Sequence, residues 1–260
     1  MTSRREVIAG ALGACATAVP LATRAQPAKR TFLLVHGSWA GGWIWRHVVD
    51  LLENQGHKVF APTLTGLGER SHLLDARVNL DTHIADIVNT IKWERLENLV
   101  LAGHSYAGDV ITGVAQEAEG AISSIVFVDA FLPLGGSLPQ MQIPAVRDAI
   151  QAAQQRSEIV LPPPAAAFFQ GNVRDRPWLD SLFTPQPIAT YTSNLTITGA
   201  RERISKKAFI RAIRYREPVL DAGYKQVKSD PAWRTYELDC GHHVMVDMPD
   251  RLTEILLQAV

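Results

Sequence analysis

The sequence has almost no cysteine, no excess of charge of either sign and no long apolar run. Its 260 residues include two cysteines, Cys15 and Cys240, which are too few for a disulfide framework. Lysine and arginine together number 26, as do aspartate and glutamate, so the overall charge does not favour a nucleic acid or an anionic membrane as partner. We therefore expect a small-molecule partner and a fold stabilised by its core, for which 47% hydrophobic residues suffice.

The apolar run near the N-terminus is too short, and too poor in large residues, to span a membrane. It follows Arg4 and Arg5 and ends in small residues at Ala25, an order typical of a twin-arginine signal peptide. We expect residues 1–25 to be that signal, with export to the bacterial periplasm or beyond. An ordinary amphipathic helix is the alternative. Residues 12–15 also resemble a lipoprotein cleavage box, with Cys15 as the lipidated residue. If the signal is removed, Cys240 is the single remaining cysteine.

Short buried-strand patterns alternate with helical segments along most of the chain. Strands are predicted at 31–35, 58–60, 99–102, 122–128, 208–213 and 233–238. Helices are predicted at 43–54, 81–93 (with Asp81 as N-cap), 105–117, 219–228 and 249–259. This alternation predicts an α/β protein with a mostly parallel, doubly wound sheet covered on both faces.

The alternation stops after Asp129. Residues 133–206 are rich in proline and alanine, carry scattered aromatic residues and show no strand periodicity. Because a structureless loop of this length is uncommon in a compact domain, we expect a mainly helical cap inserted after the strand that ends at Asp129. The predicted organisation is one core, residues 26–132 and 207–260, with the cap at 133–206.

Residues 103–108 (GHSYAG) lie where a predicted strand gives way to a predicted helix. This is the context of a nucleophile elbow, in which a sharp turn exposes a serine above the sheet, here Ser105. The usual pattern is Gly-x-Ser-x-Gly, and Ala107 replaces its second glycine. The alternative is a glycine-rich turn whose serine caps a helix.

A serine hydroxyl is a weak nucleophile unless a neighbouring base accepts its proton. His242 and His243 follow the last predicted strand, which matches the chain order of an elbow serine and its base. We predict that His242 is the base. His243 stays the alternative, because adjacent side chains point in different directions and geometry decides between them.

The acid that would orient this histidine is predicted to be Asp129. It directly follows the apolar strand at 122–128, at the same sheet edge as Ser105, where a carboxylate is costly to bury without a partner. Glu217 and Asp221, after the next predicted strand, are the alternatives. Glu217 lies close to two arginines and is interpreted as a solvated ion-pairing residue.

The backbone amides of Ser38 and Tyr106 are predicted to bind the oxygen anion of a tetrahedral intermediate, since each follows or borders a turn at the same sheet edge. Trp39, Trp43 and Trp45 are interpreted as core or pocket wall.

Three segments together resemble one branch of the α/β-hydrolases, which includes plant methylesterases, hydroxynitrile lyases and bacterial carbendazim-hydrolase-like esterases. They are residues 36–45 (HGSWAGGWIW), 62–70 (PTLTGLGER) and 103–108, and residues 128–131 (VDAF) and 238–242 (LDCGH) also look like bacterial members. The resemblance implies the α/β-hydrolase fold and a Ser–His–Asp mechanism without metal or organic cofactor. Haloalkane dehalogenases of this fold place their acid after the corresponding strand, which supports Asp129. Their nucleophile is an aspartate, so Ser105 argues against dehalogenation.

The lyases of this branch commonly have a lysine after the catalytic histidine and a threonine in the first turn, where this chain has His243 and Gly37. We therefore expect a serine esterase that cleaves a small, apolar or aromatic carboxylic ester, with carbamates and amides within reach of the same machinery. Two other readings stay open: a non-catalytic small-molecule-binding protein on the same fold, and a lyase or cofactor-free oxygenase. The oligomeric state is not predicted.

Overall fold

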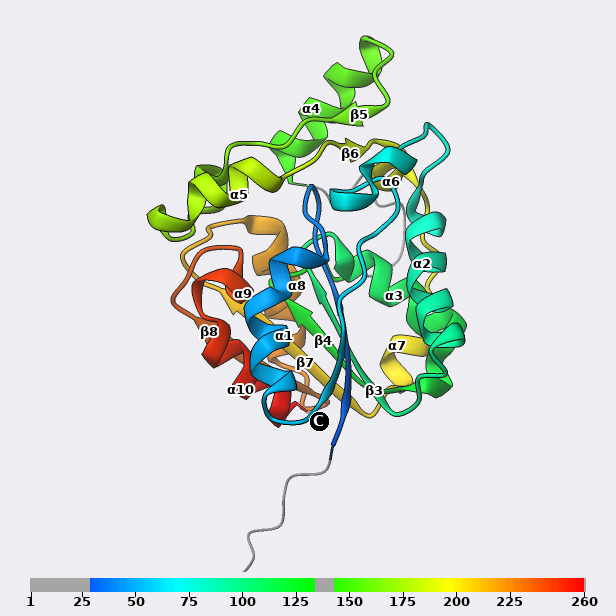
Figure 1. Ribbon diagram of the computed structural model, residues 1–260, viewed down its shortest axis with the longest axis vertical. Helices are drawn as coiled ribbons and strands as arrows, with labels where there is room; N and C mark the ends of the chain where they lie inside the picture. Colours follow the sequence, from blue (N-terminus) through cyan, green and yellow to red (C-terminus); the bar gives the residue numbers. More distant parts are fainter. Residues whose placement is uncertain (1–28, 134–142, 260) are drawn as a thin grey trace, which may run out of the picture.

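A parallel sheet runs through the centre of the protein, seen here in a computed structural model that describes residues 29–133 and 143–259 (Figure 1). Its strand order is β2-β1-β3-β4-β7-β8, and every neighbouring pair is parallel. The strands are β1 (Thr31–Val35), β2 (Lys58–Phe60), β3 (Leu99–His104), β4 (Ile122–Val128), β7 (Lys206–Ala212) and β8 (Trp233–Leu238). The predicted α/β class and parallel sheet are thus confirmed. The predicted signal peptide and Cys15 lie outside the described residues and stay predictions.

The strands are apolar on both faces because both faces are covered. In β1, Phe32 and Leu34 belong to one buried cluster, and Leu33 and Val35 belong to the other. Such two-sided burial explains why the strand sequences read as continuous apolar runs instead of alternating with polar residues.

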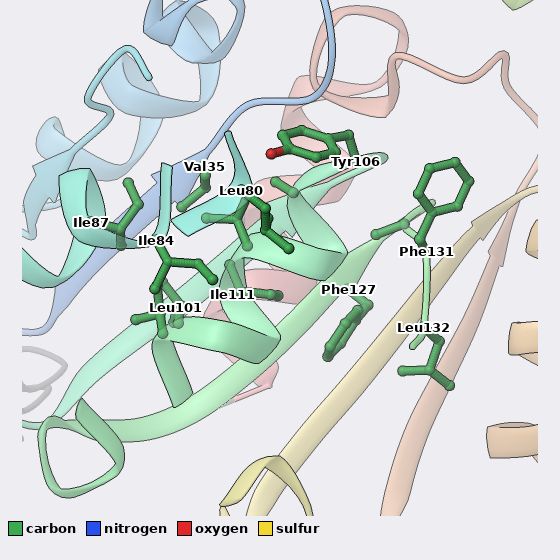
Figure 2. Close-up of a cluster of buried hydrophobic side chains, with 14 of the residues drawn as sticks. Val35, Leu80, Ile84, Ile87, Leu101, Tyr106, Ile111, Phe127, Phe131 and Leu132 are labelled. Atoms are coloured by element: carbon green, nitrogen blue, oxygen red, sulfur yellow. The ribbon is translucent and has the colours of Figure 1, made fainter. Parts of the chain in front are cut away.

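Helices of the two faces come from different parts of the chain. α1 (Arg46–Glu53), α9 (Val244–Asp247) and α10 (Pro249–Gln258) cover the face of Phe32, and α2 (Leu80–Trp93), α3 (Ala107–Ala118) and α8 (Pro218–Lys228) cover the face of Leu33. Figure 1 shows α1 and α10 on one side of the sheet and α2 and α3 on the other. Figure 2 shows part of the second cluster, with Ile84 of α2 and Ile111 of α3 close to Leu101 of β3.

The start of α2 differs from the sequence expectation. The side chain of Asn79 accepts a hydrogen bond from the Thr82 amide at 3.0 Å, and Thr82 Oγ1 accepts from the Asn79 amide at 3.3 Å. This reciprocal pair is a capping box, so the predicted cap Asp81 is wrong and Asp81 lies exposed in the first turn. The predicted helix at 43–54 also begins differently, as a 3-10 turn, Gly42–Trp45, that leads into α1.

We call residues 143–205, between β4 and β7, the cap. It contains helices and also a short antiparallel pair in which β5 (Val160–Leu161) joins β6 (Gln186–Pro187). Its helices are α4 (Pro144–Gln155), α5 (Arg176–Leu182), α6 (Ala189–Thr192) and α7 (Ala200–Arg203), with 3-10 turns at Ala166–Phe169 and Val173–Asp175. α4, α5 and α6 lie beyond the carboxyl ends of the strands of the central sheet, whereas the last helix, α7, lies beside α3 near their amino ends (Figure 1). Two further 3-10 turns, Gly68–Leu73 and Glu119–Ala121, lie outside the cap and contain no buried residues. In the described residues, no helix has the length and apolarity needed to cross a membrane.

Candidate active site

Ser105 occupies a strained turn between β3 and α3. Its backbone φ is 55°, in the left-handed region that residues with a side chain rarely adopt, so it cannot be the first residue of a right-handed helix. The helix predicted from Ser105 therefore begins two residues later, at Ala107. The Ser105 carbonyl accepts hydrogen bonds from the amides of Gly108 and Phe131, both at 3.0 Å. These bonds hold the turn in its strained conformation.

Close packing around the turn requires glycine at Gly108 rather than at position 107. A Cβ on Gly108 would lie 1.9 Å from the carbonyl oxygen of Phe131, which is backbone and cannot move aside. Ala107 is fully buried with its methyl group accommodated. On the other side, a Cβ on Gly37 would lie 2.9 Å from the Cβ of Ser105, so the turn after β1 packs directly on the serine. Because the close backbone approach occurs at Gly108, alanine is tolerated at position 107.

The structure brings Ser105, His242 and Asp129 together in one hydrogen-bonded chain. His242 Nε2 lies 2.8 Å from Ser105 Oγ, and His242 Nδ1 lies 2.6 Å from Asp129 Oδ2. All three side chains are buried, with Ser105 at the margin. They follow β3, β8 and β4, whose carboxyl ends meet at the same edge of the parallel sheet.

The second oxygen of Asp129 has partners of its own. Oδ1 accepts from the Arg211 guanidinium at 2.6 Å and from the Ala212 amide at 3.0 Å. Arg211 is 2% exposed, so two opposite charges are buried in contact and each offsets the desolvation of the other. Sequence reasoning missed Arg211, although an arginine directly after the apolar run 208–210 of a strand is itself a sign of a buried partner.

The two alternative acids lie elsewhere. Asp221 binds Arg211 at 2.9 Å from the solvent side, with a side chain 44% exposed. Glu217 is buried, its Oε1 has no hydrogen-bond partner among the described residues, and burial raises its pKa above the usual range. The interpretation of Glu217 as a solvated ion-pairing residue is therefore wrong. The chain at the start of α8 turns its carboxyl group inward, beside Tyr215.

His243 packs away from the serine. Its ring contacts Phe169 at a centroid distance of 4.5 Å and Phe183 at 5.7 Å. Its Nδ1 has no partner in the described part of the chain, and burial holds the pKa of His243 well below its usual value. The histidine in hydrogen-bonding contact with Ser105 is therefore His242.

Ser38 lies in the turn after β1 that packs on Ser105, and Tyr106 directly follows Ser105 in the chain. In the described residues, neither of their amides donates to a backbone carbonyl, so both are available to a ligand. The Ser38 side chain contacts the cap, where its Oγ lies 2.5 Å from the hydroxyl of Tyr191. The Tyr106 hydroxyl lies 3.0 Å from His83 Nδ1.

Aromatic rings surround the imidazole of His242. The Phe169 ring is nearly parallel to it at 5.7 Å, and the Tyr215 ring lies at 4.5 Å. The Phe169 ring also contacts the rings of Trp39 and Phe168. These two residues line an apolar cavity of about 280 Å³ under the cap, whose other walls are α4, Leu161 and residues 162–164. Nothing in the sequence distinguishes Phe169 and Tyr215 from other aromatic residues, because neither belongs to a motif.

The three tryptophans divide between core and pocket walls. Trp45 is fully buried in the core, and Trp39 forms part of the apolar cavity under the cap. Trp43 packs edge-to-face on Trp178 at 5.1 Å in a larger cleft of about 830 Å³ between α1, α5 and α10. None of the three residues of the Ser105 chain lines that cleft. In the described residues, no group of three or more histidine, cysteine or acidic side chains is placed to hold a metal ion.

Comparison with known proteins identifies the family of this chain. The sequence profile of the Alpha/beta hydrolase family matches residues 32–255. The chain belongs to this family. It is similar to the carbendazim hydrolyzing esterase of Nocardioides sp. (strain SG-4G), with 37% identity over 235 residues that cover 86% of this chain and 97% of that enzyme.

More distant relatives have other activities. The alpha-hydroxynitrile lyase of Arabidopsis thaliana is 34% identical over 106 residues, 40% of this chain and 41% of the lyase. Among solved structures, an extracellular alpha/beta-hydrolase from a Paenibacillus species superposes with a TM-score of 0.75 at 22% identity, covering 88% of this chain and 98% of that one. The family and the fold of this chain are thus those of an esterase-like α/β-hydrolase.

Proposed function

We propose that this α/β-hydrolase is a serine esterase that cleaves small carboxylic esters through an acyl-enzyme. The observation that carries the proposal is the continuous chain of hydrogen bonds from Ser105 through His242 to Asp129, at 2.8 and 2.6 Å. A nucleophile in contact with a base, and the base in contact with a buried acid, is the arrangement that acyl transfer requires.

In this mechanism Ser105 Oγ attacks the ester carbonyl while His242 Nε2 accepts its proton. The amides of Ser38 and Tyr106 stabilise the oxygen anion that forms. His242 then donates the proton to the departing alkoxide, and the acyl group stays on Ser105. Water, deprotonated by His242, attacks the acyl-enzyme, and the carboxylic acid leaves. Asp129 stays ionised throughout, supported by Arg211 and the Ala212 amide.

The aromatic rings beside His242, together with an apolar cavity under the cap that none of Ser105, His242 and Asp129 lines, favour apolar or aromatic substrates. Phe169 and Tyr215 flank His242, and the nearby cavity under the cap is bounded by Trp39, Phe168 and three prolines. Because the Nocardioides relative is named for carbendazim hydrolysis, carbendazim belongs in the substrate panel beside simple esters, and carbamates and amides can be assayed with it.

The direct test compares p-nitrophenyl ester hydrolysis by the parent chain and by Ser105→Ala. We expect multiple turnovers by the parent and loss of at least about 10³-fold in kcat for the variant, because the acyl-enzyme can no longer form. Ser229→Ala, which changes an exposed serine beyond the end of α8, is the matched control and keeps parental activity.

Activity that survives in Ser105→Ala would remove this serine from the mechanism. A parent that binds ligands but shows no turnover under excess substrate would support the non-catalytic alternative. Carbonyl products without a new carboxylic acid would indicate a lyase.

A further inference from the structure

The turn that carries Ser38 is hydrogen-bonded to the cap through both Ser38 and Trp39. The Trp39 amide donates to Gln186 Oε1 at 3.0 Å, and the Trp39 carbonyl accepts from the Thr184 amide at 2.8 Å. The Tyr191 hydroxyl donates to Ser38 Oγ at 2.5 Å. The Trp39 indole N–H also donates to the carbonyl of Leu161, at 3.1 Å. Cap residues thus contact the side chain of Ser38, the peptide that follows it and the next residue.

Trp39 needs these contacts because its backbone is strained. Its φ is 62°, a left-handed conformation that is unfavourable for a bulky residue. Such a conformation persists where the surrounding structure determines it. Here Gln186 fixes the N–H and Thr184 fixes the C=O of Trp39, so the direction of both of its peptide groups is set by the cap. The peptide before Ser38 carries the amide proposed to bind the oxygen anion.

Gln186 is itself held in place. It is fully buried, and its Nε2 donates to Thr190 Oγ1 at 2.8 Å, while that hydroxyl donates to the carbonyl of Pro187 at 2.6 Å. A buried amide with both ends engaged keeps a single orientation. Its oxygen therefore stays directed at the Trp39 amide, and the side chain does not have to reorient during each catalytic cycle.

Tyr191 contacts both residues of the proposed oxyanion hole. Besides its bond to Ser38, its ring packs edge-to-face on the ring of Tyr106 at a centroid distance of 5.7 Å. Tyr191 is 3% exposed, and burial raises the pKa of its hydroxyl, so it stays protonated and able to donate at neutral pH. One buried side chain from the cap thus contacts the side chains of both residues whose amides form the proposed oxyanion hole.

We propose that cap residues 184–191 act as a clamp that orients the oxyanion hole, with Gln186 and Tyr191 as positioning residues. This inference rests on the proposed esterase function. The contacts described above run from Gln186 to Trp39 and from Tyr191 to Ser38 and Tyr106, so each side chain acts through these residues. An oxyanion hole binds the transition state more tightly than the substrate, so the clamp acts on kcat more than on KM.

The test uses Gln186→Met, which keeps the length of the side chain and removes its amide, and Tyr191→Phe, which removes one hydroxyl. The controls make the same changes elsewhere: Gln55→Met on the surface and Tyr224→Phe on α8. The readouts are kcat and KM for a p-nitrophenyl ester, and the affinity for phenylboronic acid, whose tetrahedral adduct on Ser105 presents an oxygen to the hole.

We expect each clamp variant to lower kcat by roughly 10- to 100-fold, the scale for misplaced catalytic groups, with KM within about threefold of the parent. Phenylboronic acid should bind more weakly by a similar factor, and both controls should match the parent. Circular dichroism and thermal unfolding verify the fold. If Gln186→Met does not fold, Tyr191→Phe decides the question, because it leaves the packing of the ring intact.

A rise in KM with unchanged kcat would make these residues substrate-binding groups and overturn the clamp. Parental kcat and parental boronate affinity in both variants would do the same, while turnover by the parent and its loss in Ser105→Ala would keep the esterase. A parent with neither turnover nor boronate binding would overturn the esterase and the clamp together.

Discussion

At the scale of single residues, Asp129 is the most constrained group of the site. One of its oxygens contacts His242 and the other contacts Arg211, and the residue is fully buried with a φ of 44°. Removal of its charge would leave the Arg211 guanidinium buried with a weaker partner, because Asp221 lies at the exposed side of that group. The carboxylate therefore serves both the proposed chemistry and the stability of the fold.

We predict that Asp129→Asn lowers kcat by about 10⁴-fold, the scale known for loss of the acid in a Ser-His-Asp triad, because an amide no longer selects the right imidazole tautomer. Glu217→Gln and Asp221→Asn should stay within about threefold of the parent, since neither carboxyl contacts His242. Steady-state kinetics on a p-nitrophenyl ester measure all three. The opposite ranking, with Glu217→Gln inactive, would assign the acid to Glu217.

At the scale of elements, the junction of β3 and α3 depends on how closely two backbones approach. The carbonyl of Phe131 lies where a Cβ of Gly108 would be, and the Phe131 amide donates to the Ser105 carbonyl at 3.0 Å. The loop after β4 and the turn at Ser105 therefore support one another. Because Asp129 lies in that loop, the same backbone contact helps to fix the position of the predicted acid relative to the predicted nucleophile.

Gly108→Ala should destabilise the fold by about 3 kcal/mol, the upper range for added volume at a tightly packed site, and should lower activity by displacing the turn. Ala107→Gly is the neighbouring control, and should cost about 1 kcal/mol through helix propensity with activity retained. Urea unfolding and ester hydrolysis measure the two effects. Equal losses in the two variants would contradict the close approach as the cause.

At the scale of the whole molecule, buried titratable groups predict an optimum in stability near neutral pH. Burial lowers the pKa of His36 and His83 to about 4, and lowers those of His104 and His243 well below 6.5. The folded state keeps these rings neutral while the unfolded chain binds protons below about 6.5, so stability is lost as the pH falls from 6.5 towards 4.

The carboxyl group of Asp109 has the opposite effect on stability, which it lowers as the pH rises. Burial raises its pKa to about 8, and its Oδ1 has no hydrogen-bond partner among the described residues. The folded state keeps it protonated while the unfolded chain ionises it above about 4, so its contribution declines by about 1.4 kcal/mol per pH unit between 4 and 8. Four histidines outweigh this one carboxyl up to about pH 7, and the carboxyl dominates above that pH.

We therefore predict a maximum of the free energy of unfolding between about pH 6.5 and 7. Asp109→Asn should flatten the decline above the maximum, because the amide has no charge to bury, whereas Asp81→Asn, an exposed residue of α2, should leave the curve unchanged. Urea unfolding from pH 4 to 9 measures both. A parental curve that stays level up to pH 9 would contradict the raised pKa of Asp109.

Local sequence patterns were enough to predict the α/β class, the positions of the strands along the chain and the family. These follow from local patterns: short apolar runs, turns with glycine, and a serine between a strand and a helix. Because parallel strands end at the same edge of a sheet, the positions of Ser105, Asp129 and His242 after their strands already implied that these residues lie near one another.

Tertiary packing, by contrast, selected the histidine that contacts Ser105 and the carboxyl group that contacts this histidine, because neighbours in the chain point in different directions once packed. It also replaced Asp81 by Asn79 as the cap of α2 and turned Glu217 inward. The contacts of Gln186 with Trp39 and of Tyr191 with Ser38 span 147 and 153 residues of sequence. No local pattern encodes such pairs, since they form when the cap packs on the sheet edge and fixes the side chain of Ser38 and the peptide groups of Trp39.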